Sequence, residues 1–241
     1  MSEKKSADRT FRSLALEGGV IVVSILLAFG LDALWDASKR DREAQLALVS
    51  LQDEFEANLE ACVQVHDHHL DKAAHFARVF AMPLDEVAKM SDEDATDAYY
   101  AFCSPRSFDA LLGTTNSVIN TGTFSILQDA DLRRELDIFL NLMEDTHEDI
   151  QNMLHFMRVL GEYEVTIGGP WGKSSPPAPR TPDNSYFRML SGDKLAALLR
   201  DPQYTGRVQL YHGCAGWYCS ELDRLAEQIR KVLQLITALR G

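Results

Sequence analysis

The sequence lacks the short motifs that identify common enzyme reactions. It has no glycine-rich phosphate-binding loop, no nucleophile elbow and no C-x-x-C pair, and its 241 residues include only four cysteines and eight prolines. The cysteines are too few and too dispersed for a disulfide framework, and they do not identify the redox compartment; they are Cys62, Cys103, Cys214 and Cys219. These absences leave no motif from which a reaction can be named.

Clusters of basic residues are also missing. The chain carries 24 basic and 36 acidic side chains, for a net charge of −12. Residues 1–42 hold 7 of the basic and 6 of the acidic side chains, which leaves 17 basic and 30 acidic ones for residues 43–241. Nucleic acids and anionic membrane surfaces are bound through clustered Lys and Arg. We therefore expect no nucleic-acid partner.

The one long apolar run, at residues 14–36, predicts a transmembrane anchor. Fourteen uncharged residues separate Glu17 from Asp32, and at about 1.5 Å per residue they span about 21 Å, less than the roughly 30 Å hydrocarbon core of a bilayer. The segment can cross a membrane only if both carboxyl groups lie near the interfaces or face another helix. The predicted domains are a cytoplasmic tail at residues 1–13, the anchor, and an extramembrane helical domain at residues 37–241.

One face of the predicted anchor is polar or small. Helical spacing places Glu17, Ser24 and Ala28 on this face. An acid within a membrane is costly and usually faces a bundle interior, so another membrane subunit or a second copy of the chain could contact it. The alternative is that Glu17 reaches the headgroup boundary and contacts no partner. Trp35 is typical of an aromatic anchor at the interface.

A cleavable signal peptide and the orientation of the anchor are two further questions. Ala28 and Gly30 have the spacing of a cleavage site after an apolar run, but Glu17 interrupts the layout of a signal peptide, which favours an uncleaved anchor. Four basic residues precede the run and three follow it, so the positive-inside rule favours an N-terminus in the cytoplasm. The bulk of the chain would then lie in the periplasm of a bacterium, attached to the inner membrane.

Apolar residues at intervals of three and four predict that the chain is all-α. We expect the anchor to continue into one long helix that ends before Pro83. Two further long helices are predicted, one capped by Asp129 and one that starts at Pro202 after Asp201. The predicted fold is a single N-terminal transmembrane helix continuing into an elongated antiparallel bundle of about three long helices plus short helices.

Three shorter segments complete the predicted fold. Ser104 followed by Pro105 is a typical helix start and predicts a short helix over residues 106–112. Residues 114–125 are rich in Thr, Ser, Asn and Gly, which indicates a loop. Residues 168–185 contain five prolines and three glycines and predict a long exposed loop.

A set of short motifs is spread over most of the chain. The apolar N-terminal segment opens on Glu17-Gly18-Gly19, closes on Leu34-Trp35-Asp36 and runs into a charged helix. The middle of the chain carries Phe108-Asp109-Ala110-Leu111, Asn120-Thr121-Gly122, Ile126-Leu127 and Asp131-Leu132-Arg133. This pattern resembles a family of uncharacterised bacterial single-pass membrane proteins known as a domain of unknown function. Asp32-Ala33-Leu34 replaces the family's usual Asn-rich approach to the Trp. The resemblance implies the architecture of an anchor plus a helical domain, and no activity.

Cys62, His66 and His69 form the best candidate metal site in the sequence. Their spacing of i, i+4 and i+7 places a thiol and two imidazoles on one helical face, and zinc and copper accept such ligands. A fourth ligand would have to come from His147 or His155 on a facing helix. The same three positions also continue the apolar stripe of their helix, so a role in core packing is the simpler interpretation.

These features predict a membrane-anchored, non-catalytic helical interaction protein. It would be an accessory or structural subunit of a membrane complex, or a sensor-like ectodomain. Its expected partners are the membrane and other membrane-protein subunits or a second copy of the chain, and no cofactor is expected. The alternative is a metal-binding protein or metal-dependent enzyme that uses Cys62, His66 and His69 to hold zinc or copper.

Overall fold

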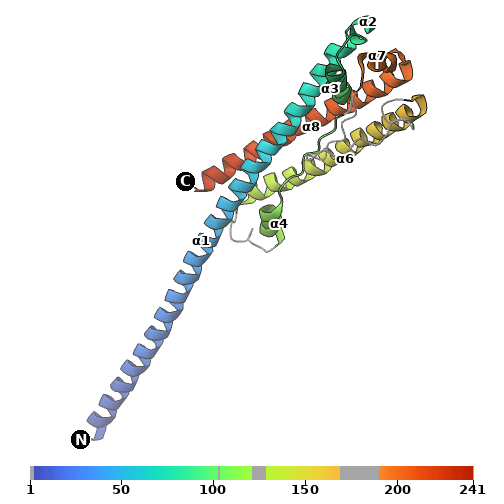
Figure 1. Ribbon diagram of the computed structural model, residues 1–241. Coiled ribbons are helices and arrows are strands. Elements are labelled where there is room, and N and C mark those ends of the chain that lie inside the picture. Colours follow the sequence, from blue (N-terminus) through green and yellow to red (C-terminus); the bar gives the residue numbers. More distant parts are fainter. Residues whose placement is uncertain (1–2, 103, 121–128, 169–189, 241) are drawn as a thin grey trace, which may run out of the picture.

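The structure, a computed structural model, describes residues 3–102, 104–120, 129–168 and 190–240; of residues 3–23 and 25 it describes the backbone alone. Within these ranges every regular element is a helix, so the predicted all-α class is confirmed (Figure 1). The three long helices are α1 (Glu3–Phe80), α6 (Ala130–Ile167) and α8 (Pro202–Arg240). The short helices are α2 (Leu84–Val87), α3 (Asp92–Phe102), α4 (Gly113–Asn120) and α7 (Gly192–Arg200).

The long helices form an elongated bundle in which α8 runs antiparallel to both α1 and α6 (Figure 1). Leu222 of α8 contacts Cys62 of α1, and Arg240, later in α8, contacts Gln52, which is earlier in α1. The two helices therefore run in opposite directions. The helices α1 and α6 consequently run in the same direction. The predicted antiparallel arrangement is wrong for this one pair, because residues 104–112 return along α1 in non-helical form before α6 begins.

Two clusters of buried apolar side chains hold the bundle together. The larger lies between α1, α6 and α8, and the smaller packs the end of α1 against α2, α3, α7 and the start of α8. The predicted apolar stripes face these clusters. In α8 the buried members of the stripe are Val208, Tyr211, Ala215, Tyr218, Leu222, Leu225, Ile229, Val232 and Ile236. The predictions of these long helices and of their buried faces are confirmed.

The N-terminal part of α1 projects beyond the bundle (Figure 1). Among the residues whose side chains are described, no helix is long and apolar enough to cross a membrane. Residues 1–23 and 25 lie outside that set, and they include Glu17 and much of the predicted anchor at residues 14–36. From residue 26 to residue 35, six large apolar side chains are between 63% and 75% exposed: Leu26, Leu27, Phe29, Leu31, Leu34 and Trp35.

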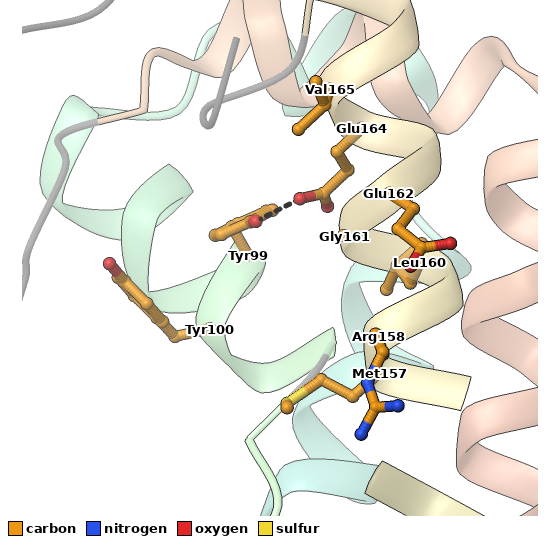
Figure 2. Close-up of a pocket in the computed structure, with 9 residues that line it drawn as sticks. All are labelled: Tyr99, Tyr100, Met157, Arg158, Leu160, Gly161, Glu162, Glu164 and Val165. Atoms are coloured by element: carbon orange, nitrogen blue, oxygen red, sulfur yellow. Dashed lines mark hydrogen bonds between the residues drawn. The ribbon is translucent and has the colours of Figure 1, made fainter. Parts of the chain in front are cut away.

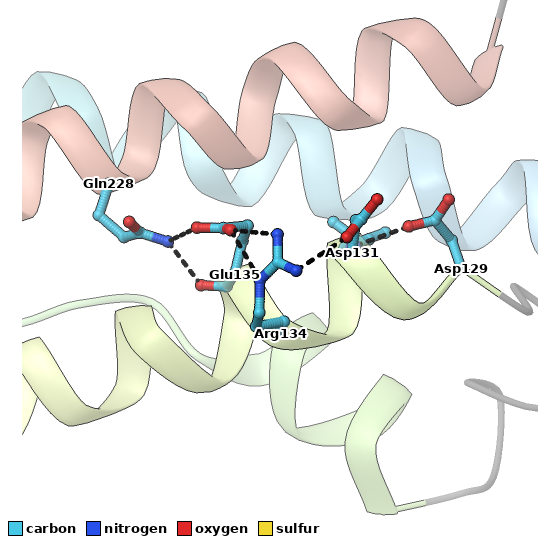
Figure 3. A network of polar contacts seen from close by, with 6 residues as sticks. Asp129, Asp131, Arg134, Glu135 and Gln228 are labelled. Carbon is cyan, nitrogen blue, oxygen red and sulfur yellow. Dashed lines mark hydrogen bonds and ion pairs between the residues drawn. The ribbon is translucent and has the colours of Figure 1, made fainter.

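A network of polar contacts joins the start of α6 to α8 (Figure 3). Asp129 caps α6 as predicted, since its carboxylate accepts a hydrogen bond of 2.6 Å from the backbone N–H of Leu132. The side-chain amide of buried Gln228 donates to both the carboxylate and the backbone carbonyl of Glu135, at 2.9 and 2.8 Å. These bonds, together with Arg134, lower the pKa of Glu135. The network therefore fixes the register of α6 against α8.

Capping residues also set the limits of the last two helices. Ser191 caps α7, and Asp201 accepts from the N–H of Gln203 at 2.8 Å at the start of α8, as predicted. Gly192 lies so close to α2 that an added Cβ would stand 2.6 Å from the carbonyl oxygen of Val87. Any larger residue at this position would push α7 away from α2. The predicted loop at residues 168–185 lies outside the described residues, apart from Gly168.

Candidate functional site

Cys62 and His66, two residues of the predicted metal site, have separate partners in the structure. The buried thiol of Cys62 donates to the backbone carbonyl of Leu222 at 3.4 Å. Burial raises the pKa of this thiol to about 11, so it is protonated at neutral pH, whereas a metal binds the thiolate. The ring of His66 lies near the surface, 3.2 Å from the carboxylate of Asp67 and 3.3 Å from that of Asp223.

His69, the third predicted ligand, binds the protein backbone. Its Nε2 lies 3.0 Å from the backbone carbonyl oxygen of Arg106, and the neighbouring His68 makes the same kind of contact with Ser104 at 2.9 Å. Burial lowers the pKa of His69, which favours the neutral ring that donates one N–H. The possible fourth ligands, His147 and His155, are exposed on α6.

Across the described ranges, no group of three or more His, Cys, Asp or Glu side chains is arranged to hold a metal ion. The structure therefore does not bring the predicted ligands together around one point. Cys62 and His69, the buried residues of this face, instead form hydrogen bonds with backbone carbonyls of neighbouring segments.

Residues 104–112 depart from the sequence prediction. The prediction of a helix over residues 106–112 is wrong, because this segment is not helical. The segment runs along α1 in the direction opposite to α1. Its backbone is satisfied by side chains instead. The amide of buried Asn58 both donates to the carbonyl of Leu111, at 2.8 Å, and accepts from its N–H, at 2.7 Å. The hydroxyl of Tyr218 in α8 accepts from the N–H of Phe108 at 2.8 Å.

Glu54 of α1 determines where the next helix starts. Its carboxylate accepts from the N–H of Thr114 at 2.6 Å, from the N–H of Thr115 at 2.9 Å and from the Thr115 hydroxyl at 2.7 Å. The two N–H groups lie in the first turn of α4, where backbone donors have no partner within the helix. A negative charge at this end of the helix also interacts favourably with the helix dipole. The loop predicted from residue 114 is therefore wrong for residues 114–120, and residues 121–125 lie outside the described part.

We call Glu54, Asn58, His68 and His69 the α1 clamp. Their four side chains lie on the part of α1 that faces residues 104–115, and all of them bond to backbone groups of that segment. A non-helical segment packed against a helix has backbone groups that no ladder satisfies, and leaving them unpaired is costly. The clamp therefore explains why polar residues occupy the buried stripe of α1.

Replacing His69 with Ala is expected to lower the free energy of unfolding by about 2 kcal/mol, because the part-buried hydrogen bond to the Arg106 carbonyl is lost and the buried ring loses its edge contact with Tyr218. Replacing His66 with Ala is the matched control and should change the free energy of unfolding by less than about 0.5 kcal/mol, since its contacts are with the exposed carboxylates of Asp67 and Asp223. Denaturation measures the stability, and elemental analysis measures bound metal. If the unmodified protein carried stoichiometric zinc or copper and either variant lost it, a structural role for these residues would be contradicted.

A pocket of about 520 Å³ lies between α3 and α6, at the opposite end of the bundle from α4 (Figures 1 and 2). Its walls are mostly apolar, and the lining residues come from the end of α3 and the last three turns of α6. They are Tyr99, Tyr100, Met157, Arg158, Leu160, Gly161, Glu162, Glu164 and Val165. A concave apolar space with a few polar groups is the usual form of a small-molecule site.

Glu164 is the buried acidic group of this pocket. It is 2% exposed, its side chain points toward α3, and its carboxyl oxygen Oε2 accepts a hydrogen bond of 2.7 Å from the hydroxyl of Tyr99 (Figure 2). The hydroxyl of Tyr204, from α8, bonds to the same carboxyl group. Burial raises the pKa of Glu164 to about 7 against the opposing effect of these two hydrogen bonds. At neutral pH the group can therefore gain or lose a proton readily.

The sequence analysis did not single out Glu164, Tyr99 or Tyr204 as site residues. A signal was nevertheless present for Glu164. The buried positions of α6 include Met153 and Leu160, and Glu164 follows Leu160 by four residues on the same face. An acid that continues an apolar stripe indicates a buried carboxyl group with a hydrogen-bonding partner.

Comparison of the chain with protein-family models, with curated proteins and with solved structures found no significant match.

Proposed function

We propose that the chain is a membrane-anchored, non-catalytic helical interaction protein, in which α1 carries both the anchor and one wall of the bundle. The observation that carries this proposal is the exposed apolar part of α1 between residues 26 and 35. It adjoins the apolar run at residues 14–25 in the sequence, and the helix continues through both without a break.

The distribution of the exposed side chains favours lipid over a single docking helix. At about 100° of rotation per residue, the six side chains from Leu26 to Trp35 cover roughly two thirds of the circumference of α1. A partner helix would cover one stripe, whereas hydrocarbon surrounds a helix on all sides. An arrangement of this kind is unfavourable in water and favourable in a bilayer.

The continuity of α1 supports an interaction role for the bundle. Leu51, Phe55 and Cys62 of the same helix are fully buried between α6 and α8. The bundle would thus be held at a fixed distance from the membrane rather than on a loose linker. We place it, by the basic residues that flank the apolar run, in the periplasm at a bacterial inner membrane, as an accessory or structural subunit or a sensor-like ectodomain. The resemblance to the single-pass family supports the same architecture.

Purification of the full-length chain from its native membrane in mild detergent tests the interaction role. We expect a membrane protein in fixed ratio, or a defined oligomer of the chain itself. Replacing Glu17 with Leu should reduce that ratio severalfold, because the polar face formed by Glu17, Ser24 and Ala28 would lose its acid.

Leu26→Ala is the control, since Leu26 lies about 180° from Glu17 around the helix. This variant should co-purify with the same partner as the unmodified chain. A chain that purifies alone as a monomer would contradict the interaction role. Equal loss of the partner in both variants would contradict the assignment of the polar face.

A further inference from the structure

We infer that the pocket between α3 and α6 is a binding site for a small organic cation with an apolar body, such as an arylalkylamine. The inference is independent of the proposed interaction role, because it requires only the folded bundle. Three features of the pocket carry it: the size and apolar character of its walls, the acid at its inner end, and the aromatic rings beside that acid.

The space suits a molecule of modest size with an apolar body. Its volume of about 520 Å³ lies within the range of about 300–1,000 Å³ that is usual for small-molecule sites. Met157, Leu160 and Val165 supply aliphatic wall surface from one face of α6. Gly161 lies between them, and an added Cβ at this position would meet no atom within 4 Å, so the missing side chain leaves room at the wall.

The charges around the pocket favour a positive head group. Glu164 lies at the inner wall and is shielded from solvent, so its charge acts through a medium of low dielectric constant. Arg158 and Glu162 are exposed at the edge of the pocket, and their opposite charges offset one another. An anion would face the buried carboxylate, while a cation would neutralise it. The net charge of −12 further raises the local concentration of cations.

Aromatic rings beside the acid provide a second attraction for a cation. Tyr99 and Tyr100 both line the pocket, with ring centroids 5.5 Å apart and ring planes at 71° to each other. Aromatic faces attract ammonium groups, and the combination of such rings with a carboxylate is typical of amine recognition. The groups that face Glu164 are the hydroxyls of Tyr99 from α3 and Tyr204 from α8. The charged residues of its own helix that line the pocket, Arg158 and Glu162, are exposed.

The test compares 4-phenylbutylamine with its uncharged counterpart 4-phenylbutan-1-ol. Both are titrated by NMR into the full-length protein in zwitterionic nanodiscs, with empty nanodiscs to correct for partition into lipid. At about pH 8, where Glu164 is ionised and the amine is charged, we expect the amine to bind about tenfold more tightly than the alcohol. At about pH 5.5, where Glu164 is protonated, that preference should fall to about threefold or less.

Two variants identify the site. Glu164→Gln keeps a hydrogen-bonding partner for Tyr99 but no charge, and it should abolish the pH dependence of the preference. Gly161→Leu fills the open wall and should weaken both ligands at least about tenfold, while circular dichroism shows the bundle intact. Glu162→Gln removes an exposed charge at the edge and is the matched control, with the preference retained.

Equal binding of amine and alcohol by the unmodified protein would overturn the inference. So would an absence of binding by either ligand, or a preference for the amine that survives in Glu164→Gln. Binding that Gly161→Leu leaves unchanged would also overturn it, because the ligand would then lie elsewhere. None of these outcomes bears on the membrane anchor or on co-purification with a partner, so failure here is distinguishable from failure of the proposed function.

Discussion

Replacing Glu54 with Ala is expected to lower the free energy of unfolding by about 3–4 kcal/mol. The carboxylate is 8% exposed and accepts three hydrogen bonds from Thr114 and Thr115, and Thr115 is fully buried. Its removal leaves two buried donors of Thr115 unpaired and removes the negative charge at the start of α4, and each unpaired buried donor costs about 1–3 kcal/mol. Chemical denaturation of the full-length protein in mild detergent measures the loss.

Amide hydrogen exchange separates a local from a global effect of this substitution. In Glu54→Ala the amide protons of α4 should exchange much faster than those of α8, because α4 loses its cap while the central core stays packed. Glu56→Ala is the matched control, since Glu56 is an exposed residue of the same helix and accepts a hydrogen bond from the nearby Gln52 side chain. A loss of stability no larger than that of Glu56→Ala would contradict the clamp.

The second large effect is a dependence of stability on pH that comes from Glu164. Folding raises the pKa of this group from 4.5 to about 7, so the folded protein retains a proton that the unfolded chain releases. The stabilising contribution is present below about pH 4.5 and is lost as the pH rises to about 7. The shift corresponds to about 3 kcal/mol of unfolding free energy between about pH 4.5 and pH 8.

The effect of Glu164 must be measured as a difference from Glu164→Gln. Partial burial lowers the pKa of His212 to about 4, and the pKa of His69 is shifted in the same direction, so these groups make stability rise with pH over part of the range. They titrate in both proteins and cancel in the difference. The variant should match the unmodified protein at about pH 4 and be about 3 kcal/mol more stable at about pH 8. A difference that does not change with pH would contradict the assignment.

The long helices could be predicted from the sequence because the residues that define each helix lie within it or directly beside it. Stripes of apolar residues at helical spacing and a capping Asp define α6 and α8, and α8 also has a proline at its first position. The structure of residues 104–120 depends instead on side chains of α1 that lie about fifty residues earlier in the chain. Ser104 and Pro105 form a good local helix start, but the tertiary hydrogen bonds from Asn58 and His69 outweigh it.

The candidate sites show the same limit of local information. The spacing of Cys62, His66 and His69 correctly indicates one helical face, but it cannot reveal which atoms lie opposite. In the structure Cys62 and His69 face backbone carbonyls of two other segments. The pocket at Glu164 is lined by residues of α3 and α6, and the hydroxyl of Tyr204 from α8 bonds to Glu164. These residues are separated by up to about a hundred positions, and only the folded bundle brings them together.

We propose that α1 is embedded in a bilayer through its apolar part and carries the bundle on the same helix. Extraction of native membranes with alkaline carbonate tests it most directly, because this treatment releases proteins bound to the membrane surface and leaves embedded ones behind. We expect the full-length chain to stay in the membrane pellet and the double variant Leu27→Lys, Phe29→Lys to be released with its bundle folded. Release of the unmodified chain into the supernatant would contradict it.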